Sequence, residues 1–215
     1  MTQARKLVID HNVKFIMENF YTESIPENDP NQEEEKPFQL KRFLIELLQT
    51  ILISALLYLA IDAISARIQV LSISMQPTLF EKDFVLVNKV VYKIGAPEQG
   101  DVIVFRYPPN PETTPYIKRV IGLPGDTVRI TNGKVFVNDQ PITEPYIAAP
   151  PDYNGQWFIG NNELFVLGDN RNNSSDSHQW GMVPLENVIG KAEFVYWPVE
   201  HWQVLHMQAA VAASP

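Results

Sequence analysis

The sequence predicts a mainly β domain preceded by one transmembrane helix. The run from Phe43 to Ile61 contains fifteen apolar residues among nineteen. After Arg67, short segments rich in Val, Ile, Phe and Tyr alternate with Gly, Pro, Asn and Asp, which is typical of short strands separated by turns. The chain of 215 residues also contains 17 prolines, so few long helices are expected outside the apolar run.

The overall composition excludes several classes of protein and site. Apolar residues make up 45% and charged residues 20% of the chain, which is enough for a packed core. The formal net charge of −8 argues against a general nucleic-acid binder, because such proteins carry a basic surface. Cysteine is absent, so disulfides, thiol nucleophiles and thiolate metal sites are excluded.

Residues 1–42 are expected to form a polar cytoplasmic tail. Apolar residues at helical spacing predict a weak amphipathic helix near its start: Ile9, Val13, Ile16 and Phe20. Pro26, Pro30 and the acidic run Glu33–Glu35 then predict a polar linker. A solvated tail is the simpler interpretation, and a helix that docks on a partner or on the membrane surface is the alternative.

Residues 43–61 are predicted to be a transmembrane helix. At 1.5 Å per residue they extend about 28 Å, close to the thickness of a bilayer's hydrocarbon core. A buried soluble helix would show an amphipathic pattern, and a cleaved signal peptide would not follow so long a segment. Lys36, Lys41 and Arg42 precede the run, whereas only Arg67 follows closely. The positive-inside rule therefore places the N-terminus in the cytoplasm and residues 62–202 on the exported side.

The exported residues 62–202 are expected to fold into short strands. The candidate strands are Arg67–Ile73, Phe84–Val91, Val102–Tyr107, Tyr116–Leu123, Thr127–Thr131, Lys134–Asn138, Glu163–Leu167 and Val188–Trp197. Asn132-Gly133 between two of them is typical of a type I′ hairpin turn. We expect Tyr146–Gly160 to be a long surface loop and the Ala-rich residues 203–215 to be an unanchored tail.

The sequence offers two kinds of catalytic base. The four histidines are His11, His178, His201 and His206. His11 falls on the cytoplasmic side, and His201 and His206 lie near the C-terminal end. Only His178 lies in a polar, glycine-flanked region, so a Ser-His-Asp triad is poorly supported. Lys118 lies in the otherwise apolar segment Tyr116–Ile121, where burial would lower its pKa and make it a base. The alternative is a surface lysine on an edge strand.

Two polar segments could complete a catalytic site. In Ser72–Leu79, Ser72 and Ser74 lie two residues apart, so one can attack a carbonyl while the other donates to the oxyanion. A polar turn is the alternative. Gly168–Gly181 is dense in Asn, Asp and Ser, which predicts a loop held by its own side chains that could orient a neighbouring group. A simple turn or an oxygen-rich cation cluster is the alternative there, although EF-hand spacing is not met.

Together these segments resemble the type I signal peptidases, membrane-bound serine proteases that remove signal peptides from exported proteins. The resemblance covers about Phe43 to Trp202, and its boxes follow in family order: the membrane span, Ser72–Leu79, Gly100–Phe105, Tyr116–Asp126 and Gly168–Gly181. It implies an antiparallel β-sheet catalytic core and no metal or organic cofactor. The implied partners are signal peptides of exported preproteins, the lipid bilayer and, transiently, the export machinery, with no nucleic acid.

The resemblance also implies a role for each matching residue. Ser74 matches the nucleophile and Lys118 the general base of a Ser-Lys dyad that works through an acyl-enzyme. Ser72 matches the serine that shares the oxyanion hole with the Ser74 N–H, Ser174 the serine that orients the lysine, and Asp176 an acid that supports the site electrostatically. Cleavage after Ala-x-Ala-like sequences is implied by shallow pockets whose matching residues are Val70, Met75, Leu79, Val85, Val104 and Ile117.

The chain departs from the family pattern at a few positions. Ile73 stands where several members have Gly, and Asn172 where many have Asp. His178 stands where many have Arg, which is expected to remove an ion pair with Asp176. Two other functions remain open: a self-cleaving repressor of the same superfamily, and a catalytically silent, membrane-tethered β scaffold that binds exported chains.

Overall fold

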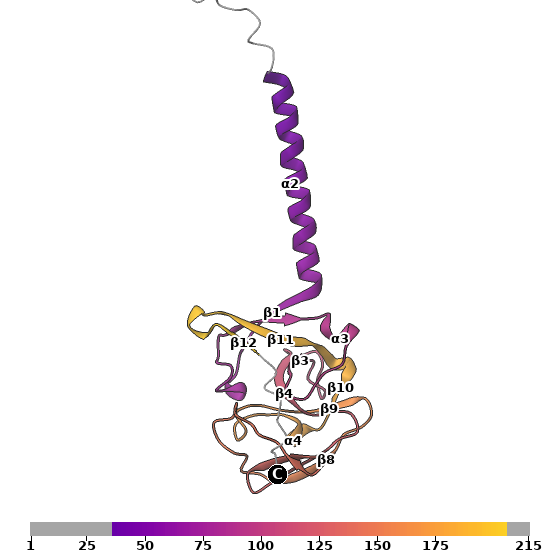
Figure 1. Ribbon diagram of the computed structural model, residues 1–215, viewed down its shortest axis with the longest axis vertical. Coiled ribbons are helices and arrows are strands. Elements are labelled where there is room, and N and C mark those ends of the chain that lie inside the picture. Colours follow the sequence, from indigo (N-terminus) through magenta and orange to yellow (C-terminus); the bar gives the residue numbers. More distant parts are fainter. Residues whose placement is uncertain (1–35, 206–215) are drawn as a thin grey trace, which may run out of the picture. The chain divides into compact units, whose positions relative to one another are not determined.

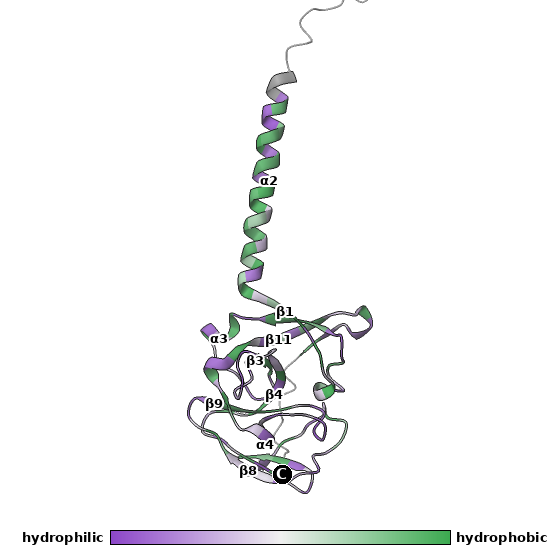
Figure 2. Ribbon diagram, turned by 180° about the vertical axis from the view of Figure 1, so that it is seen from behind, coloured by the Kyte–Doolittle hydropathy of each residue, from purple (hydrophilic) through white to green (hydrophobic). Residues whose placement is uncertain are grey.

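The computed structural model describes residues 36–205, with side chains from residue 39 onward. Helix α2 occupies Lys36–Ile64, and its segment Gln39–Ile64 is long and apolar enough to cross a membrane. Figure 2 shows apolar residues along this helix. The helix therefore extends beyond the predicted boundaries of 43 and 61. The amphipathic helix expected near the N-terminus, His11, His206 and most of the Ala-rich tail lie outside the described residues.

Three polar residues in the first half of α2 bond to one another one turn apart. Arg42 Nε donates to Glu46 Oε1 at 3.0 Å, and Thr50 Oγ1 donates to the Glu46 carbonyl oxygen at 2.8 Å. Because a bilayer offers no water to unpaired polar groups, these local bonds lower the cost of placing Glu46 and Thr50 in the helix.

After α2 the chain forms two antiparallel sheets (Figure 1). The larger sheet has the order β1-β2-β11-β3-β4-β9-β10, and β12 also pairs with β11. Its strands are β1 (Ser65–Gln69), β2 (Phe84–Asn88), β3 (Val102–Phe105), β4 (Tyr116–Gly122), β9 (Glu163–Leu167), β10 (Val183–Pro184), β11 (Val188–Trp197) and β12 (Gln203–Val204). The smaller sheet has the order β7-β6-β5-β8. Its strands are β5 (Thr127–Thr131), β6 (Lys134–Val137), β7 (Gln140–Pro141) and β8 (Gly155–Phe158). The predicted fold class, a mainly β antiparallel domain behind one apolar helix, is confirmed.

Short helical turns connect the strands. They are the 3₁₀ turns η1 (Ile73–Met75), η2 (Leu185–Asn187) and η3 (Val199–His201), and the single α-helical turns α3 (Val91–Ile94) and α4 (Ser177–Trp180). Two predicted strands end early, each a few residues before such a turn. The strand predicted over 67–73 ends at Gln69, ahead of η1, and the strand predicted over 84–91 ends at Asn88, ahead of α3.

The hairpin prediction is confirmed. Asn132 and Gly133 have φ values of 50° and 73°, which are the left-handed conformations that a type I′ turn requires. Two other predictions are wrong. The expected surface loop over 146–160 contains β8, and the expected tail from residue 203 begins with β12, followed by the buried Leu205. Strands this short, with Pro or Asn close by, give too little hydrophobic alternation to be recognised.

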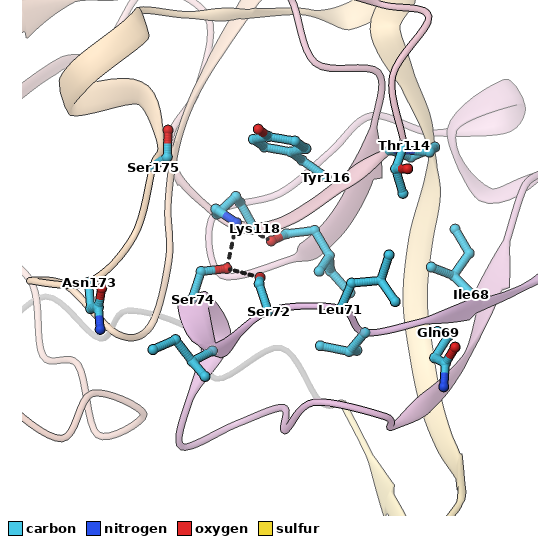
Figure 3. A pocket seen from close by; sticks show the side chains of 14 residues that line it. Ile68, Gln69, Leu71, Ser72, Ser74, Thr114, Tyr116, Lys118, Asn173 and Ser175 are labelled. Carbon is cyan, nitrogen blue, oxygen red and sulfur yellow. Dashed lines mark hydrogen bonds between the residues drawn. The ribbon is translucent and has the colours of Figure 1, made fainter.

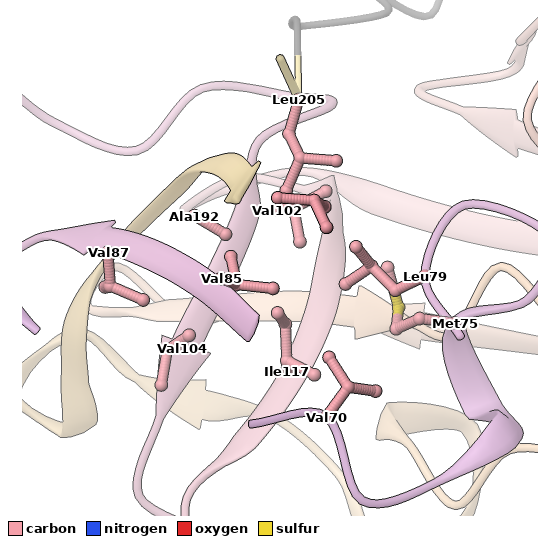
Figure 4. Close-up of a cluster of buried hydrophobic side chains, with 11 residues drawn as sticks. Val70, Met75, Leu79, Val85, Val87, Val102, Val104, Ile117, Ala192 and Leu205 are labelled. Atoms are coloured by element: carbon pink, nitrogen blue, oxygen red, sulfur yellow. The ribbon is translucent and has the colours of Figure 1, made fainter. Parts of the chain in front are cut away.

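Three clusters of buried apolar side chains stabilise the domain. The first cluster consists of Val70, Met75, Leu79, Val85, Val87, Val102, Val104, Ile117, Ala192, Val195 and Leu205 (Figure 4). The second packs the smaller sheet against β4 and β9, and the third lies around β3, β9 and β10. The first cluster matters for the site, because Met75 immediately follows Ser74 and Ile117 immediately precedes Lys118.

Candidate active site

Lys118 lies in the centre of the larger sheet. Its strand β4 pairs with β3 on one side and with β9 on the other, and Lys118 is opposite Ile103 on β3. Its exposed fraction is only 3%. A surface lysine on an edge strand, the alternative interpretation of this segment, is therefore wrong.

The Lys118 amine points at the Ser74 hydroxyl (Figure 3). Nζ of Lys118 donates to Ser74 Oγ at 2.8 Å and to the Ile117 carbonyl oxygen at 2.9 Å, and it lies 5.4 Å from the centre of the Tyr116 ring. Burial lowers the pKa of Lys118 to about 8, although the negative charges of Asp176 and Asp169 oppose this shift. An amine in this environment loses its proton much more readily than an exposed lysine.

Ser74 is presented by the turn η1. Gln76, just before Pro77, is extended with ψ of 141°, as expected of a residue that precedes proline, and the turn ends there. Ser74 is 7% exposed, and Ser72 Oγ lies 3.1 Å from Ser74 Oγ. The two serines are thus adjacent in space as well as in sequence.

The polar segment after β9 packs directly on this turn. The Asn170 amide N–H donates to the Ser74 carbonyl oxygen at 3.1 Å, and Asn170 Nδ2 donates to the Ile73 carbonyl oxygen at 3.2 Å. A Cβ atom at Gly168 would collide with Ser174 Oγ and with the Ser74 carbonyl oxygen, so the backbone of Gly168 approaches both residues closely. Sequence analysis identified this loop but not the individual contact made by Asn170.

Ser174 and Asp176 are buried in the same loop. Ser174 is 7% exposed, and its hydroxyl has no hydrogen-bond partner among residues 36–205, so the expected bond to Lys118 is not formed in this structure. Asp176 is fully buried, and its Oδ2 accepts from the Gly168 N–H at 2.9 Å. The negative charge of Asp176 is one of the two that act on Lys118.

His178 contacts Asp176, although a histidine in place of the family's arginine was expected to remove this pairing. Nδ1 of His178 lies 2.6 Å from Asp176 Oδ1, and the imidazole stacks on the Tyr153 ring with 4.0 Å between centroids. The backbone N–H of His178 also donates to Asp176 Oδ1, because Asp176 caps the turn α4. The His178 imidazole is therefore held close to the Asp176 carboxylate, which caps the turn two residues earlier.

A groove of about 400 Å³ opens beside Ser74 and Lys118. It is lined by residues 68–74, 114–118, Asn173 and Ser175. Of the six predicted pocket residues, Val70 and Ile117 line this groove. The other four, Met75, Leu79, Val85 and Val104, are fully buried in the core cluster beneath it (Figure 4). The sequence prediction missed several lining residues: Ile68, Gln69, Leu71, Thr114 and Tyr116.

Comparison with known proteins identifies the family. The family model described as signal peptidase, peptidase S26, matches residues 44–197. The chain belongs to this signal peptidase family. It is 46% identical over 166 residues to signal peptidase I of Leptolyngbya laminosa, covering 73% of this chain and 81% of that protein. It is 38% identical over 207 residues to probable signal peptidase I-2 of Synechocystis sp., covering 90% of this chain and 92% of that protein.

In this member of the signal peptidase family, a buried ion pair lies next to Lys118, on the opposite face of β4. Arg119 donates to both carboxylate oxygens of Asp169, at 2.8 and 2.7 Å, and to the Gly100 carbonyl oxygen at 2.9 Å. The Tyr146 ring lies 3.9 Å from the Arg119 guanidinium carbon. Sequence analysis missed this pair, although an arginine next to Lys118 in an apolar strand was an available signal.

A second buried ion pair anchors the loop that follows Gly168. Arg171 donates to both carboxylate oxygens of Glu144, at 2.8 and 2.6 Å, and to the Gly168 carbonyl oxygen at 3.0 Å. Bidentate pairs of this kind fix geometry as well as charge. Between residues 36 and 205, no group of three or more His, Asp and Glu side chains is arranged to hold a metal ion.

Proposed function

We propose that this chain is a membrane-bound serine endopeptidase that removes N-terminal signal peptides from exported preproteins. In this proposal Ser74 is the nucleophile and Lys118 the general base, and cleavage follows small residues in Ala-x-Ala-like sequences. The observation that carries the proposal is the buried 2.8 Å contact between Lys118 Nζ and Ser74 Oγ.

The surroundings of Lys118 suit the role of a base at neutral pH. With a pKa of about 8, roughly one molecule in ten carries the neutral amine at pH 7, compared with about one in 3,000 for an exposed lysine. The Ile117 carbonyl oxygen accepts one N–H of the amine. The lone pair of the neutral amine is then free to accept the Ser74 proton.

The proposed reaction has two stages. Lys118 takes the proton of Ser74 as Ser74 Oγ attacks the scissile carbonyl carbon, and the Ser74 N–H and the Ser72 hydroxyl stabilise the oxyanion. The protonated Lys118 then gives its proton to the leaving amine, which forms an acyl-enzyme on Ser74. In the second stage Lys118 takes a proton from water as the water oxygen attacks the ester carbon. Lys118 then returns this proton to Ser74 Oγ as the ester bond breaks and the carboxylic acid product leaves.

The packing below the groove supports a preference for small side chains. Val70 and Ile117 form part of its wall, and the fully buried Met75 and Leu79 fill the space behind them. Because protein cores are close-packed, a large substrate side chain would have to displace these residues. Alanine needs little space and fits such a shallow site.

The proposed topology rests on α2. Lys41 and Arg42 precede its apolar stretch, which supports a cytoplasmic N-terminus and a catalytic domain on the exported side. The partners that this topology implies are the lipid bilayer, the signal peptides of preproteins and, transiently, the export machinery.

The test is incubation of the full-length protein, in detergent micelles, with a preprotein that carries an Ala-x-Ala site. The wild type should release the mature protein, whereas the Ser74→Ala variant should not. Ser65→Ala is a matched control, because the Ser65 hydroxyl only bonds the Ile61 carbonyl oxygen at the end of α2. Equal cleavage by Ser74→Ala would contradict the assigned nucleophile. Binding of the preprotein without cleavage by the wild type would favour a silent scaffold.

A further inference from the structure

His178 and Asp176 form a histidine–carboxylate pair that the proposed mechanism does not use. Nδ1 of His178 lies 2.6 Å from Asp176 Oδ1, and the His178 side chain is 14% exposed, whereas the Asp176 side chain is fully buried. Solvent protons can therefore reach the imidazole, while the carboxylate depends on protein groups for its partners. Its other oxygen, Oδ2, accepts the Gly168 N–H.

This pair is linked to the dyad in two ways. The first is structural, because Asp176 holds Gly168, and Gly168 packs against the Ser74 carbonyl oxygen. The second is electrostatic, because the Asp176 charge acts on Lys118 and favours its protonated form. Any positive charge that partly cancels Asp176 therefore favours the neutral, basic form of Lys118.

The surroundings of His178 leave Asp176 as its charged partner. Tyr153 stacks against the imidazole with an angle of 11° between the rings. The other charged groups that act on Tyr153 are Arg171, Glu144 and Asp152. Arg171 and Glu144 neutralise each other in their bidentate pair, and Asp152 is exposed, so solvent screens its charge. The charge of the side chain at position 178 therefore acts mainly on Asp176.

We propose that His178 is a positioning residue whose imidazole adjusts, through Asp176, the negative charge that faces Lys118, and thereby extends peptidase activity into more acidic conditions. A positive charge beside Asp176 weakens the field of that carboxylate at Lys118, so Lys118 gives up its proton more easily than it does beside a neutral side chain. An arginine at this position carries that charge at every pH, and a glutamine carries it at none. This inference rests on the proposed Ser-Lys chemistry.

The test compares the acid limb of kcat/KM in the wild type, His178→Arg and His178→Gln. Arginine is charged throughout and glutamine is neutral throughout, and both can still donate to Asp176. The pH of half-maximal activity should be lowest for His178→Arg and highest for His178→Gln, with about half a pH unit or more between them. A purely structural role would lower the plateau and leave the midpoint unchanged. If His178→Gln does not fold, a midpoint for His178→Arg that is not below that of the wild type still overturns the proposal.

The chain offers a matched control in a second histidine–aspartate pair. His201 Nδ1 lies 2.6 Å from Asp83 Oδ1, but Asp83 holds the Phe80 N–H and is not among the charges that act on Lys118. His201→Gln should therefore leave the midpoint where it is. A shift as large as that of His178→Gln would mean that the effect comes from general destabilisation and would overturn the proposal.

A measurement without catalysis separates this inference from the proposed function. In the Ser74→Ala background, the rate at which cyanate carbamylates Lys118 reports the neutral amine and can be followed by peptide mass spectrometry. The same order of midpoints is expected when His178→Arg and His178→Gln are added to that background. Coincident titrations of Lys118 would overturn the role of His178, whereas a correct order with no peptidase activity would contradict only the proposed function.

Discussion

Lys118 Nζ lies 2.8 Å from Ser74 Oγ although the two residues are 44 positions apart in the chain. The lysine is fixed on a central strand, and the serine is fixed on a turn whose carbonyl groups are bonded by Asn170. Neither side chain has to move to bring the proposed nucleophile and the proposed base together. Preorganisation of this kind lowers the entropic cost of the reaction.

The first prediction concerns the identity of the base. Lys118→Arg keeps a positive charge but cannot lose a proton near neutral pH, and Lys118→Met keeps much of the side-chain volume without any basic group. Both variants should lose about 10³-fold or more in kcat/KM for preprotein cleavage, which is in the range expected for removal of a general base. Circular dichroism should show that both variants fold. Substantial activity in Lys118→Arg would rule out a deprotonated lysine as the base.

The second prediction concerns pH. The basic form of Lys118 is the neutral form, and burial holds its pKa at about 8. Activity should therefore be constant above about pH 8 and fall nearly tenfold for each pH unit below it. A pH profile of kcat/KM between pH 5 and 9.5, in buffers of constant ionic strength, tests this. A profile that stays flat down to pH 5 would be incompatible with a lysine base.

The third prediction is that Lys118, the proposed base, reduces the stability of the fold. The folded-state pKa of Lys118, about 8, lies below the value of 10.5 expected in the unfolded chain. Below pH 8 both states carry the proton, and the folded state bears the full cost of the buried charge. Between pH 8 and 10.5 the folded state releases the proton first, so this cost disappears as pH rises. Lys118→Met should therefore be more stable than the wild type by up to about 3 kcal/mol at pH 6, and the difference should shrink toward pH 10.5. Thermal unfolding of both proteins at the two pH values measures this, and an equal difference at both would contradict it.

The fourth prediction concerns the close approach of Gly168. Gly168→Ala would drive a methyl group into Ser174 Oγ and the Ser74 carbonyl oxygen, so the turn that carries the nucleophile has to shift. We expect a loss of about 100-fold in kcat/KM, because displacement of a reacting group by about 1 Å has effects of this size. Gly95→Ala is the control, since its added methyl group meets only the Val91 carbonyl oxygen at 3.3 Å. Comparable losses in the two variants would mean that the contact at Gly168 is not specific to the site.

The sequence predicted the apolar helix, the longer strands and the Asn132-Gly133 hairpin, because local periodicity and turn chemistry determine these features. It could not predict from the residues alone that Lys118 lies on a central strand, because strand order depends on pairing between distant segments. The sequence also could not predict that four of the six expected pocket residues lie below the groove. Whether a residue reaches the surface depends on the elements that pack over it, and these come from distant parts of the chain. The contact between His178 and Asp176 was missed because a residue two positions beyond a helix cap folds back to the cap, which family comparison alone does not reveal.

The last prediction concerns the buried Arg119–Asp169 ion pair and its contribution to the stability of the fold. Asp169→Ala would leave the Arg119 guanidinium, which is 1% exposed, without its carboxylate partner. The Gly100 carbonyl oxygen, the Tyr146 ring and the weak 3.5 Å contact with Thr78 would remain, and none of them carries a negative charge. An unpaired buried charge costs about 3–5 kcal/mol, so the free energy of unfolding should fall by this amount. The double variant Asp169→Ala/Arg119→Met should recover most of the loss, since methionine fills the volume without a charge. Chemical denaturation of the single and double variants measures this coupling. If the losses in unfolding free energy of Asp169→Ala and Arg119→Met simply add in the double variant, the ion pair contributes little to stability. Asp169 then has to act on Lys118 through its charge alone.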